Sequence, residues 1–321
     1  MNPAIDTIRV GDGRSLGRLI DRLRDAQVIG VDTEFLTERS YYPRLCLLQI
    51  ASKDLLAVVD PLACHDLQPL AQIFAGDVEL VVHSGAQDLA ILNRHLGTVP
   101  EKVFDTQIGA AFLGYGHSIG YARLVEACCN VRLRRSQAYT DWGKRPLDRR
   151  QIDYALDDVR HLLCCRKRLR GELLRRARLT WAEDECAAVR AAALWKIDPR
   201  KQWRRLSGVR GLNGRALAVL EEVTAWREEE AAARDQPRQR LVPDRVLVEI
   251  ARRQPQRLGQ LGDLRGLHPN EARRSGEAII AAVKVGLRRP PDSWPHWPAR
   301  PPASEDLAVG VLATLLDAFL R

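Results

Sequence analysis

Several features of other protein classes are missing from this sequence of 321 residues. It has no run of about 18 apolar residues, so we expect no membrane-spanning helix and no membrane partner. The opening MNPAIDTIRVGDG lacks the basic and then apolar pattern of a secretory signal. The seven cysteines are odd in number and form no CxxC pair, which argues against a disulfide framework and a zinc site. We therefore expect buried free thiols and a cytoplasmic location, where the surroundings are reducing.

Positive charge is concentrated in the second half of the chain. Residues 1–165 hold 19 Lys and Arg against 21 Asp and Glu, a net charge of −2, whereas residues 166–321 hold 31 against 20, a net charge of +11, which agrees with the total of +9. This asymmetry indicates an active domain joined to a domain that binds a polyanion. An arginine-rich proteome that uses arginine for solubility would give the same composition, so both explanations stay open.

Short apolar runs alternate with amphipathic segments through the first half. We predict helices near 13–25, 67–75, 86–96, 107–113 and 120–128, and strands at 28–35, 45–52, 55–61, 80–83 and 104–106. Only Lys53 and Asp54 separate the second strand from the third, so these two form a hairpin. Strands mixed with helices indicate an α/β layer fold with a mixed sheet.

A long helix is predicted from Asp148 onward. Asp148 can cap it, and Gln151, three residues later, completes a pattern like a capping box. The positions expected to form its buried stripe are Ile152, Ala155, Leu156, Val159, Leu162 and Leu163.

The second half is predicted to be helical. We expect a helical connector at 176–206, a small all-helical domain at 207–288, a stiff proline-rich linker at 289–303 and an amphipathic helix at 304–321. A lone helix cannot bury its own apolar face, so the last one must dock on the body, pair with another chain or begin a further module.

Acidic side chains recur at positions where a carboxylate is costly to bury or crowd. Asp32 and Glu34 are two apart on a predicted strand, so they share one face at the end of a buried run. Two neighbouring carboxylates repel unless a proton or a metal lies between them, and such oxygen donors favour Mg²⁺ or Mn²⁺. Asp88 lies in the first turn of a predicted helix. Considered one at a time, Asp32 and Glu34 are better explained as a solvated strand end. Asp88 is better explained as an aspartate that complements the dipole of its helix.

The predicted helix after Asp148 carries the remaining candidates. Tyr154 and Asp158 are four apart and therefore share one face, about 40° apart around the axis. Asp157 is rotated by about 100° from Asp158, so we expect Asp158 to be the metal ligand and Asp157 to face solvent. The simpler explanation of the Tyr154 and Asp158 pair is a surface hydrogen bond.

Together and in this order, these segments resemble the DEDD exonuclease superfamily, in the branch with tyrosine in the third motif, and most closely the ribonuclease D family. The matching residues are Asp32 and Glu34 in DTEF, Tyr42-Pro43, Leu48-Gln49-Ile50, His83 and Asp88 in HSGAQDL, Phe104-Asp105-Thr106-Gln107, Asp141-Trp142, Arg145-Pro146-Leu147, and Tyr154 and Asp158 in YALDD. Residues 207–288 are similar to an HRDC domain. The resemblance implies a ribonuclease H-like mixed sheet flanked by helices in an exonuclease domain of residues 1–175, followed by an all-helical HRDC-like domain. Members of the family usually have a second HRDC-like domain, of which only a first helix, at 304–321, is expected here.

The resemblance also implies a reaction. Such enzymes are metal-dependent 3′–5′ exoribonucleases that release nucleoside 5′-monophosphates and use two divalent ions, Mg²⁺ or Mn²⁺. Asp32 would bridge both ions, Glu34 and Asp158 would hold the ion that activates water, and Asp88 would serve the ion at the leaving oxygen. Tyr154 would aim the water, because a phenol with a pKa of about 10 is a poor base at neutral pH.

Substrate contacts are expected from aromatic and basic side chains near these motifs. Phe35, Tyr42 and Trp142 are candidates to stack on bases, and Arg145 to contact a phosphate. His83 is expected to donate or accept a hydrogen bond beside the site rather than bind a metal, since Mg²⁺ prefers oxygen. Core packing of the aromatic rings and a solvated basic face are the competing explanations.

The resemblance implies a monomer that binds RNA, namely tRNA precursors with 3′ trailers and other structured RNAs. Two alternatives are a DEDD exonuclease directed at DNA and a non-catalytic scaffold that binds nucleic acid. The scaffold is disfavoured because all four carboxylates and the tyrosine are present.

Overall fold

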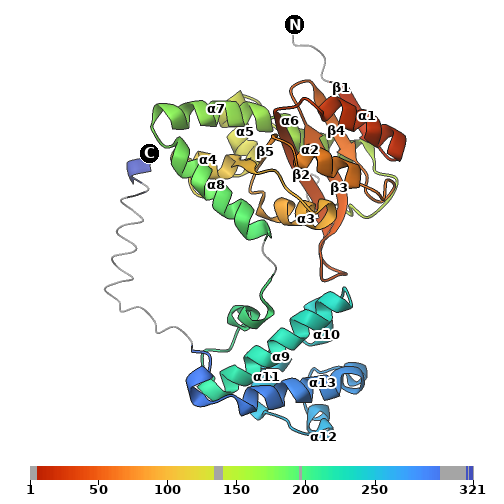
Figure 1. The fold of residues 1–321 in the computed structure, drawn as a ribbon, viewed down its shortest axis with the longest axis vertical. Coiled ribbons are helices and arrows are strands. Elements are labelled where there is room, and N and C mark those ends of the chain that lie inside the picture. Colours follow the sequence, from red (N-terminus) through yellow and green to blue (C-terminus); the bar gives the residue numbers. More distant parts are fainter. Residues whose placement is uncertain (1–5, 134–139, 195–196, 297–315, 317, 321) are drawn as a thin grey trace. The chain divides into compact units, whose positions relative to one another are not determined.

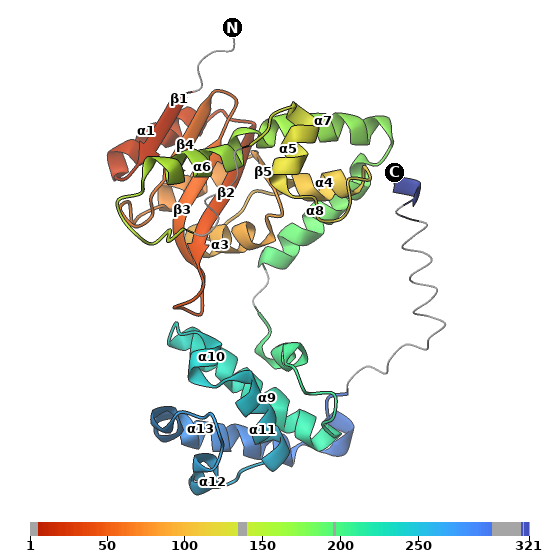
Figure 2. The same cartoon turned by 180° about the vertical axis from the view of Figure 1, so that it is seen from behind.

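The computed structural model describes residues 6–133, 140–194, 197–296, 316 and 318–320. These residues fall into two compact units, shown from two sides in Figures 1 and 2. The first unit contains residues 6–36 and 45–194 with 316 and 318–320, and the second contains 37–44 and 197–296. Within these described ranges, no helix combines the length and the apolar character needed to cross a bilayer.

A six-stranded sheet forms the centre of the first unit, with the strand order β1-β4-β3-β2-β5-β6. β1 is parallel to β4, and β2, β5 and β6 are parallel in succession, whereas β3 and β4 are antiparallel. The mixed sheet is therefore confirmed, and β2 lies inside it between β3 and β5. The strand bounds are β1 (Asp6–Val10), β2 (Val28–Leu36), β3 (Arg44–Ala51), β4 (Leu55–Val59), β5 (Glu79–Val82) and β6 (Lys102–Asp105).

Helices cover both faces of this sheet, and α3 and α6 lie on opposite sides of it (Figures 1 and 2). One face packs against α1 and α3 in a core that includes Leu19, Ile29 and Leu89. The other face packs against α6 in a second core that includes Cys46, Ala155 and Val159. The helices are α1 (Gly13–Leu23), η1 (Gln68–Leu70), α2 (Ala71–Phe74), α3 (Ala86–Leu96), α4 (Thr106–Ala111), α5 (Tyr121–Cys129), α6 (Arg149–Arg160), α7 (Leu162–Arg175) and α8 (Leu179–Leu194).

Two elements differ from the sequence-based expectation. β1 was not predicted, because this short strand is largely exposed and has no apolar run to mark it. The single long helix after Asp148 is two helices, since His161 separates α6 from α7 and its backbone N–H donates to the hydroxyl of Tyr121 at 3.2 Å. The predicted cap is confirmed, because Asp148 and Gln151 form a reciprocal capping box.

The cysteines also depart from expectation. Cys129 at the end of α5 and Cys164 in α7 form a disulfide, so the expectation of free thiols is wrong for this pair. The other five cysteines are free and buried, as expected. The packing of α5 on α7 brings two adjacent pairs together, and the Sγ atoms of Cys129 and Cys165 are 3.8 Å apart. Helix packing, which sequence spacing does not reveal, decides this pairing.

The second unit is helical, as predicted, and α9 is its central helix. Val219, Leu220 and Val223 of α9 are fully buried in its core. α13 approaches α9 so closely that a Cβ on Gly286 would lie 2.6 Å from the Val219 Cα. The elements are η2 (Pro199–Arg205), α9 (Gly214–Ala233), α10 (Arg238–Leu241), α11 (Asp244–Arg253), α12 (Leu258–Gly262), α13 (Pro269–Arg288) and η3 (Pro291–Ser293).

Most of the predicted helix at 304–321 lies outside the described residues. Residues 318–320 are helical, and the guanidinium of Arg178 donates to the carbonyls of Phe319 and Leu320. Arg178 also lies over the Phe319 ring, 4.9 Å from its centroid.

Candidate active site

The alternation of β2 places three positions toward α6 and α7. Gly30, Asp32 and Glu34 are two residues apart and therefore share one face of the strand. At Gly30 the strand touches the start of α7, because an added Cβ would lie 3.1 Å from the Leu162 Cβ. The absence of a side chain at residue 30 lets the end of α6 lie close to the two carboxylates that follow.

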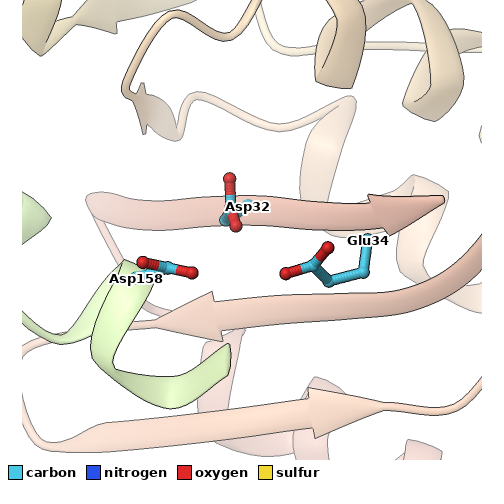
Figure 3. Close-up of side chains that lie close together, drawn as sticks. All are labelled: Asp32, Glu34 and Asp158. Carbon is cyan, nitrogen blue, oxygen red and sulfur yellow. The ribbon is translucent and has the colours of Figure 1, made fainter. Parts of the chain in front are cut away.

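α6 supplies the third carboxylate. One oxygen from each of Asp32, Glu34 and Asp158 lies within 4.8 Å of the others. Figure 3 shows the two acidic side chains of β2 and the one from α6 gathered at the same place. Asp157 lies outside this group and instead accepts a hydrogen bond from Arg160 at 2.9 Å.

Burial and mutual repulsion perturb these carboxylates. Desolvation and then the charges of Asp88, Asp158 and Glu34 raise the pKa of Asp32 well above its ordinary value. Desolvation, followed by the charge of Asp158, raises the pKa of Glu34 to about 8. Desolvation also raises the pKa of Asp158 to about 7. A cation is the natural partner for such a cluster, and three carboxylate oxygens fit a hard divalent ion.

Asp88 lies near this trio but outside it. It is buried in the first turn of α3, and its Oδ1 accepts a short hydrogen bond from the hydroxyl of Thr33. Burial raises the pKa of Asp88, and the Thr33 hydrogen bond opposes that rise. The parallel pairing of β2 with β5 explains its position, because Gly30 is opposite Val81 and the chain enters α3 just beyond that point.

Asp105 fixes the turn that precedes α3. Its carboxylate accepts the backbone N–H groups of Ser84 at 2.9 Å and of Gly85 at 2.8 Å. Ser84 has a left-handed backbone with φ of 58°, and a Cβ on Gly85 would overlap Val82. This tight turn sets where Asp88 begins its helix.

Tyr154 lies beside the trio on α6. Its hydroxyl lies near the carboxylate of Asp158, one turn later, and opposes the rise in the pKa of Asp158. Burial and the charge of Asp158 raise the pKa of Tyr154. Trp142 packs its ring 6.1 Å from the Tyr154 ring and is only 4% exposed, so it supports the tyrosine and offers a base little surface.

The other predicted substrate contacts are placed differently. Arg145 donates all five of its N–H groups within the protein, to the Asp60 carboxylate and to three backbone carbonyls. Tyr42 belongs to the second unit, where its backbone N–H donates to Asp235 at 3.1 Å. Phe35 is half-buried on β2, directly after Glu34.

His83 is tied to the protein rather than to the carboxylates. Its Nε2 donates to the Ile119 carbonyl at 3.1 Å, and its Nδ1 lies 2.9 Å from the Thr106 hydroxyl. Burial lowers the pKa of His83. Both ring nitrogens are therefore engaged within the protein.

Three supporting residues were not identified from the sequence. Thr33 was missed because alternation directs it away from Asp32 and Glu34, and Gly30 because its role depends on the approach of α7. Asp105 lies in a matching motif, but nothing local shows that it binds the Ser84 turn. Its place at the start of a helix was the one available signal, since its side chain caps α4.

Comparison with known proteins agrees with this geometry. A family model described as 3′-5′ exonuclease matches residues 9–174, and one described as HRDC domain matches residues 216–283. Trypanosoma brucei RRP6, in its catalytic core, shares the fold with a TM-score of 0.66 at 23% identity, covering 88% of this chain and 79% of that chain.

Relatives with a higher sequence identity are named ribonuclease D. Ribonuclease D of Zymomonas mobilis is 38% identical over 293 residues, covering 89% of this chain and 74% of that protein. Ribonuclease D of Nitrobacter hamburgensis is 39% identical over 283 residues, covering 87% of this chain and 74% of that protein. The crystal structure of Escherichia coli RNase D matches with a TM-score of 0.84 at 32% identity, covering 98% of this chain and 84% of that chain. The chain therefore belongs to the ribonuclease D family and is a 3′–5′ exoribonuclease with an HRDC domain.

Proposed function

We propose that the acidic centre holds two divalent ions, Mg²⁺ or Mn²⁺, and removes nucleoside 5′-monophosphates from the 3′ end of RNA. The observation that supports this proposal is the approach of Asp32, Glu34 and Asp158 to within 4.8 Å of one another. Half-buried carboxylates at this separation repel, as their raised pKa values reflect, and a hard cation removes that repulsion.

Each carboxylate has a distinct place in this scheme. Asp32 experiences the charges of Asp88, Asp158 and Glu34 together, so it would be shared by both ions. Glu34 and Asp158 would hold one ion, and Asp88 would serve the other. When bound, the ions would lower the pKa of the attacking water and stabilise the charge on the leaving 3′ oxygen.

Tyr154 would orient the attacking water. Its pKa is raised, so the hydroxyl keeps its proton near neutral pH and does not act as a base. The hydroxyl lies near Asp158, one turn away on the same face of α6, and packing of Trp142 limits the movement of the ring. A water held at the same phenolic oxygen would be aimed along a fixed direction.

The proposed substrates are tRNA precursors with 3′ trailers and other structured RNAs, acted on by a monomer in the cytoplasm. Escherichia coli RNase D is described as an exoribonuclease involved in structured RNA processing, which supports this choice. The excess of basic residues after residue 165 supports contact with a folded polyanion. Phe35 is the candidate in the first unit to stack on the terminal base.

The contribution of the second unit is tested with exposed arginines. Arg205, Arg210 and Arg215 are exposed, and each belongs to no ion pair among the described residues. Replacing all three by Gln should weaken binding to folded RNA and reduce the slope of log affinity against log salt by up to about 3. Cleavage of a short single-stranded oligomer should be unchanged. Equal losses on both substrates would contradict the proposed role.

The decisive experiment uses 5′-labelled single-stranded RNA and DNA of one sequence, with and without a chelator. We expect a ladder that shortens from the 3′ end of RNA alone and disappears with the chelator. Equal shortening of DNA would favour the DNA-directed exonuclease. Binding without shortening of either strand would favour the non-catalytic scaffold.

A further inference from the structure

Thr33 is the residue between the two acidic positions of β2, and it faces the other way. Its side chain is 6% exposed, and that of Asp88 is 8% exposed. The two meet in the interior, where the Thr33 hydroxyl donates to Oδ1 of Asp88. A hydrogen bond between a hydroxyl and a buried carboxylate is short and strong, because the acceptor is charged when ionised.

This contact leaves the two oxygens of Asp88 unequal. Oδ1 accepts from Thr33, whereas no hydrogen bond from a described side chain reaches Oδ2. Asp88 is also the one acidic residue of the four that lies outside the trio. The backbone around it is fixed from the other side by Asp105, which holds the turn before α3.

We propose that Thr33 is a positioning residue for the metal centre: its hydroxyl fixes the Asp88 carboxylate so that Oδ2 is the oxygen left for a divalent cation. This inference rests on the proposed function, because it assumes that Asp88 serves one of the two ions. Partners that orient a metal ligand typically change metal affinity by about 10–100-fold when they are removed.

A structural role alone would give a different result. If Thr33 only satisfied a buried carboxylate, its loss would lower the stability of the fold and leave the affinity for cations unchanged. Cation affinity and thermal stability therefore need to be measured on the same variants.

The experiment is a calorimetric titration of the RNA-free full chain with MnCl₂. Thr33→Val keeps the volume and removes the hydroxyl, and it should weaken Mn²⁺ binding by about 10-fold. Thr33→Ser keeps the hydroxyl and should bind within about threefold of the parent chain. Should Thr33→Val fail to fold, Thr33→Ala replaces it, since Ser and Ala differ by the hydroxyl alone. Equal Mn²⁺ affinity for Ser and Ala overturns the inference.

A double-mutant cycle with Asp88→Asn tests whether Thr33 changes the Mn²⁺ affinity through Asp88. The Thr33→Val change should have no further effect on Mn²⁺ affinity in the Asp88→Asn background. The same tenfold loss in both backgrounds overturns the inference while leaving the proposed function intact. A parent chain that binds no Mn²⁺ overturns the proposed function and this inference together.

Discussion

Gly30 of β2 and Leu162 of α7 are in close contact, and this contact brings the acidic end of α6 to the sheet. A Cβ at residue 30 would lie 3.1 Å from the Cβ and 3.2 Å from the Cδ1 of Leu162. Asp158 is four residues before Leu162, so any displacement of α7 is passed to it directly. The separation of the carboxylates thus depends on Gly30, a residue that has no side chain.

Gly30→Ala is therefore expected to lower both stability and activity. Overpacking should cost about 1–3 kcal/mol of unfolding free energy, and displacement of Asp158 should reduce kcat at least about 10-fold. Urea unfolding and single-turnover cleavage of a labelled oligomer measure the two effects. Gly17→Ala in α1 is the control, because an added Cβ there meets nothing within 4 Å. It should leave activity unchanged and stabilise the helix by about 0.5–1 kcal/mol.

Asp32→Asn should abolish hydrolysis while RNA binding is retained. The change keeps the shape of the side chain and removes the charge that both ions would share. Cleavage assays with Mg²⁺ or Mn²⁺, combined with gel-shift binding, separate these two properties. Asp157→Asn is the matched control, since this aspartate pairs with Arg160 and should keep its rate within about twofold. Full activity in Asp32→Asn would remove the acidic trio from the mechanism.

Tyr154→Phe should reduce kcat by about 100-fold or more and leave Mn²⁺ affinity nearly unchanged. The substitution removes one hydroxyl, which lies near Asp158 and would orient the water, while the ring stays packed beside Trp142. Single-turnover kinetics at saturating Mn²⁺ measure the chemical step. A rate equal to that of the parent chain would exclude the tyrosine from catalysis.

The metal-free protein is expected to lose stability as pH rises from about 5 to about 8. The pKa of Glu34 is raised from 4.5 to about 8 and that of Asp158 from 3.8 to about 7. Because protons bind the folded chain more tightly than the unfolded chain, the stabilisation is complete at low pH and is lost as pH passes these raised values.

Thermal unfolding checks this dependence with and without Mg²⁺. Each kcal/mol corresponds to roughly 2–4 °C in Tm for a chain of this size class. Mg²⁺ should raise Tm more at pH 8 than at pH 5.5, because the cation replaces protons that have left the carboxylates. An equal increase at both pH values would show that the cation binds elsewhere.

Local periodicity along the chain predicts which candidate side chains share a face, whereas the family resemblance is what joins them into one site. Asp32 and Glu34 share a face because a strand alternates, and Tyr154 and Asp158 share one because a helix turns every 3.6 residues. The capping box at Asp148 is equally local, and the prediction of it is confirmed. The mixed sheet follows from the order of strands and helices along the chain.

Local periodicity does not predict contacts between segments that are far apart in the sequence. Arg145 was expected to bind phosphate, but its five N–H groups are donated to Asp60, Cys46 and its own loop, contacts that require β3 and β4 to be in place. The sequence left both base stacking and core packing open for Trp142, and tertiary packing buries this side chain in the core. The disulfide of Cys129 and Cys164 likewise depends on how two helices meet.

Arginines whose N–H groups are all donated within the protein, such as Arg145, contribute little to the binding of nucleic acid. Arg234 forms ion pairs with Glu230 and Glu271, and Arg289 forms ion pairs with Glu221 and Glu222. A guanidinium whose charge is already neutralised inside the fold cannot displace a counterion from a phosphate backbone. The count of 50 Lys and Arg therefore overstates the number of cations that an approaching polymer meets, and the thermodynamic valence of binding is set by those that form no ion pair within the protein.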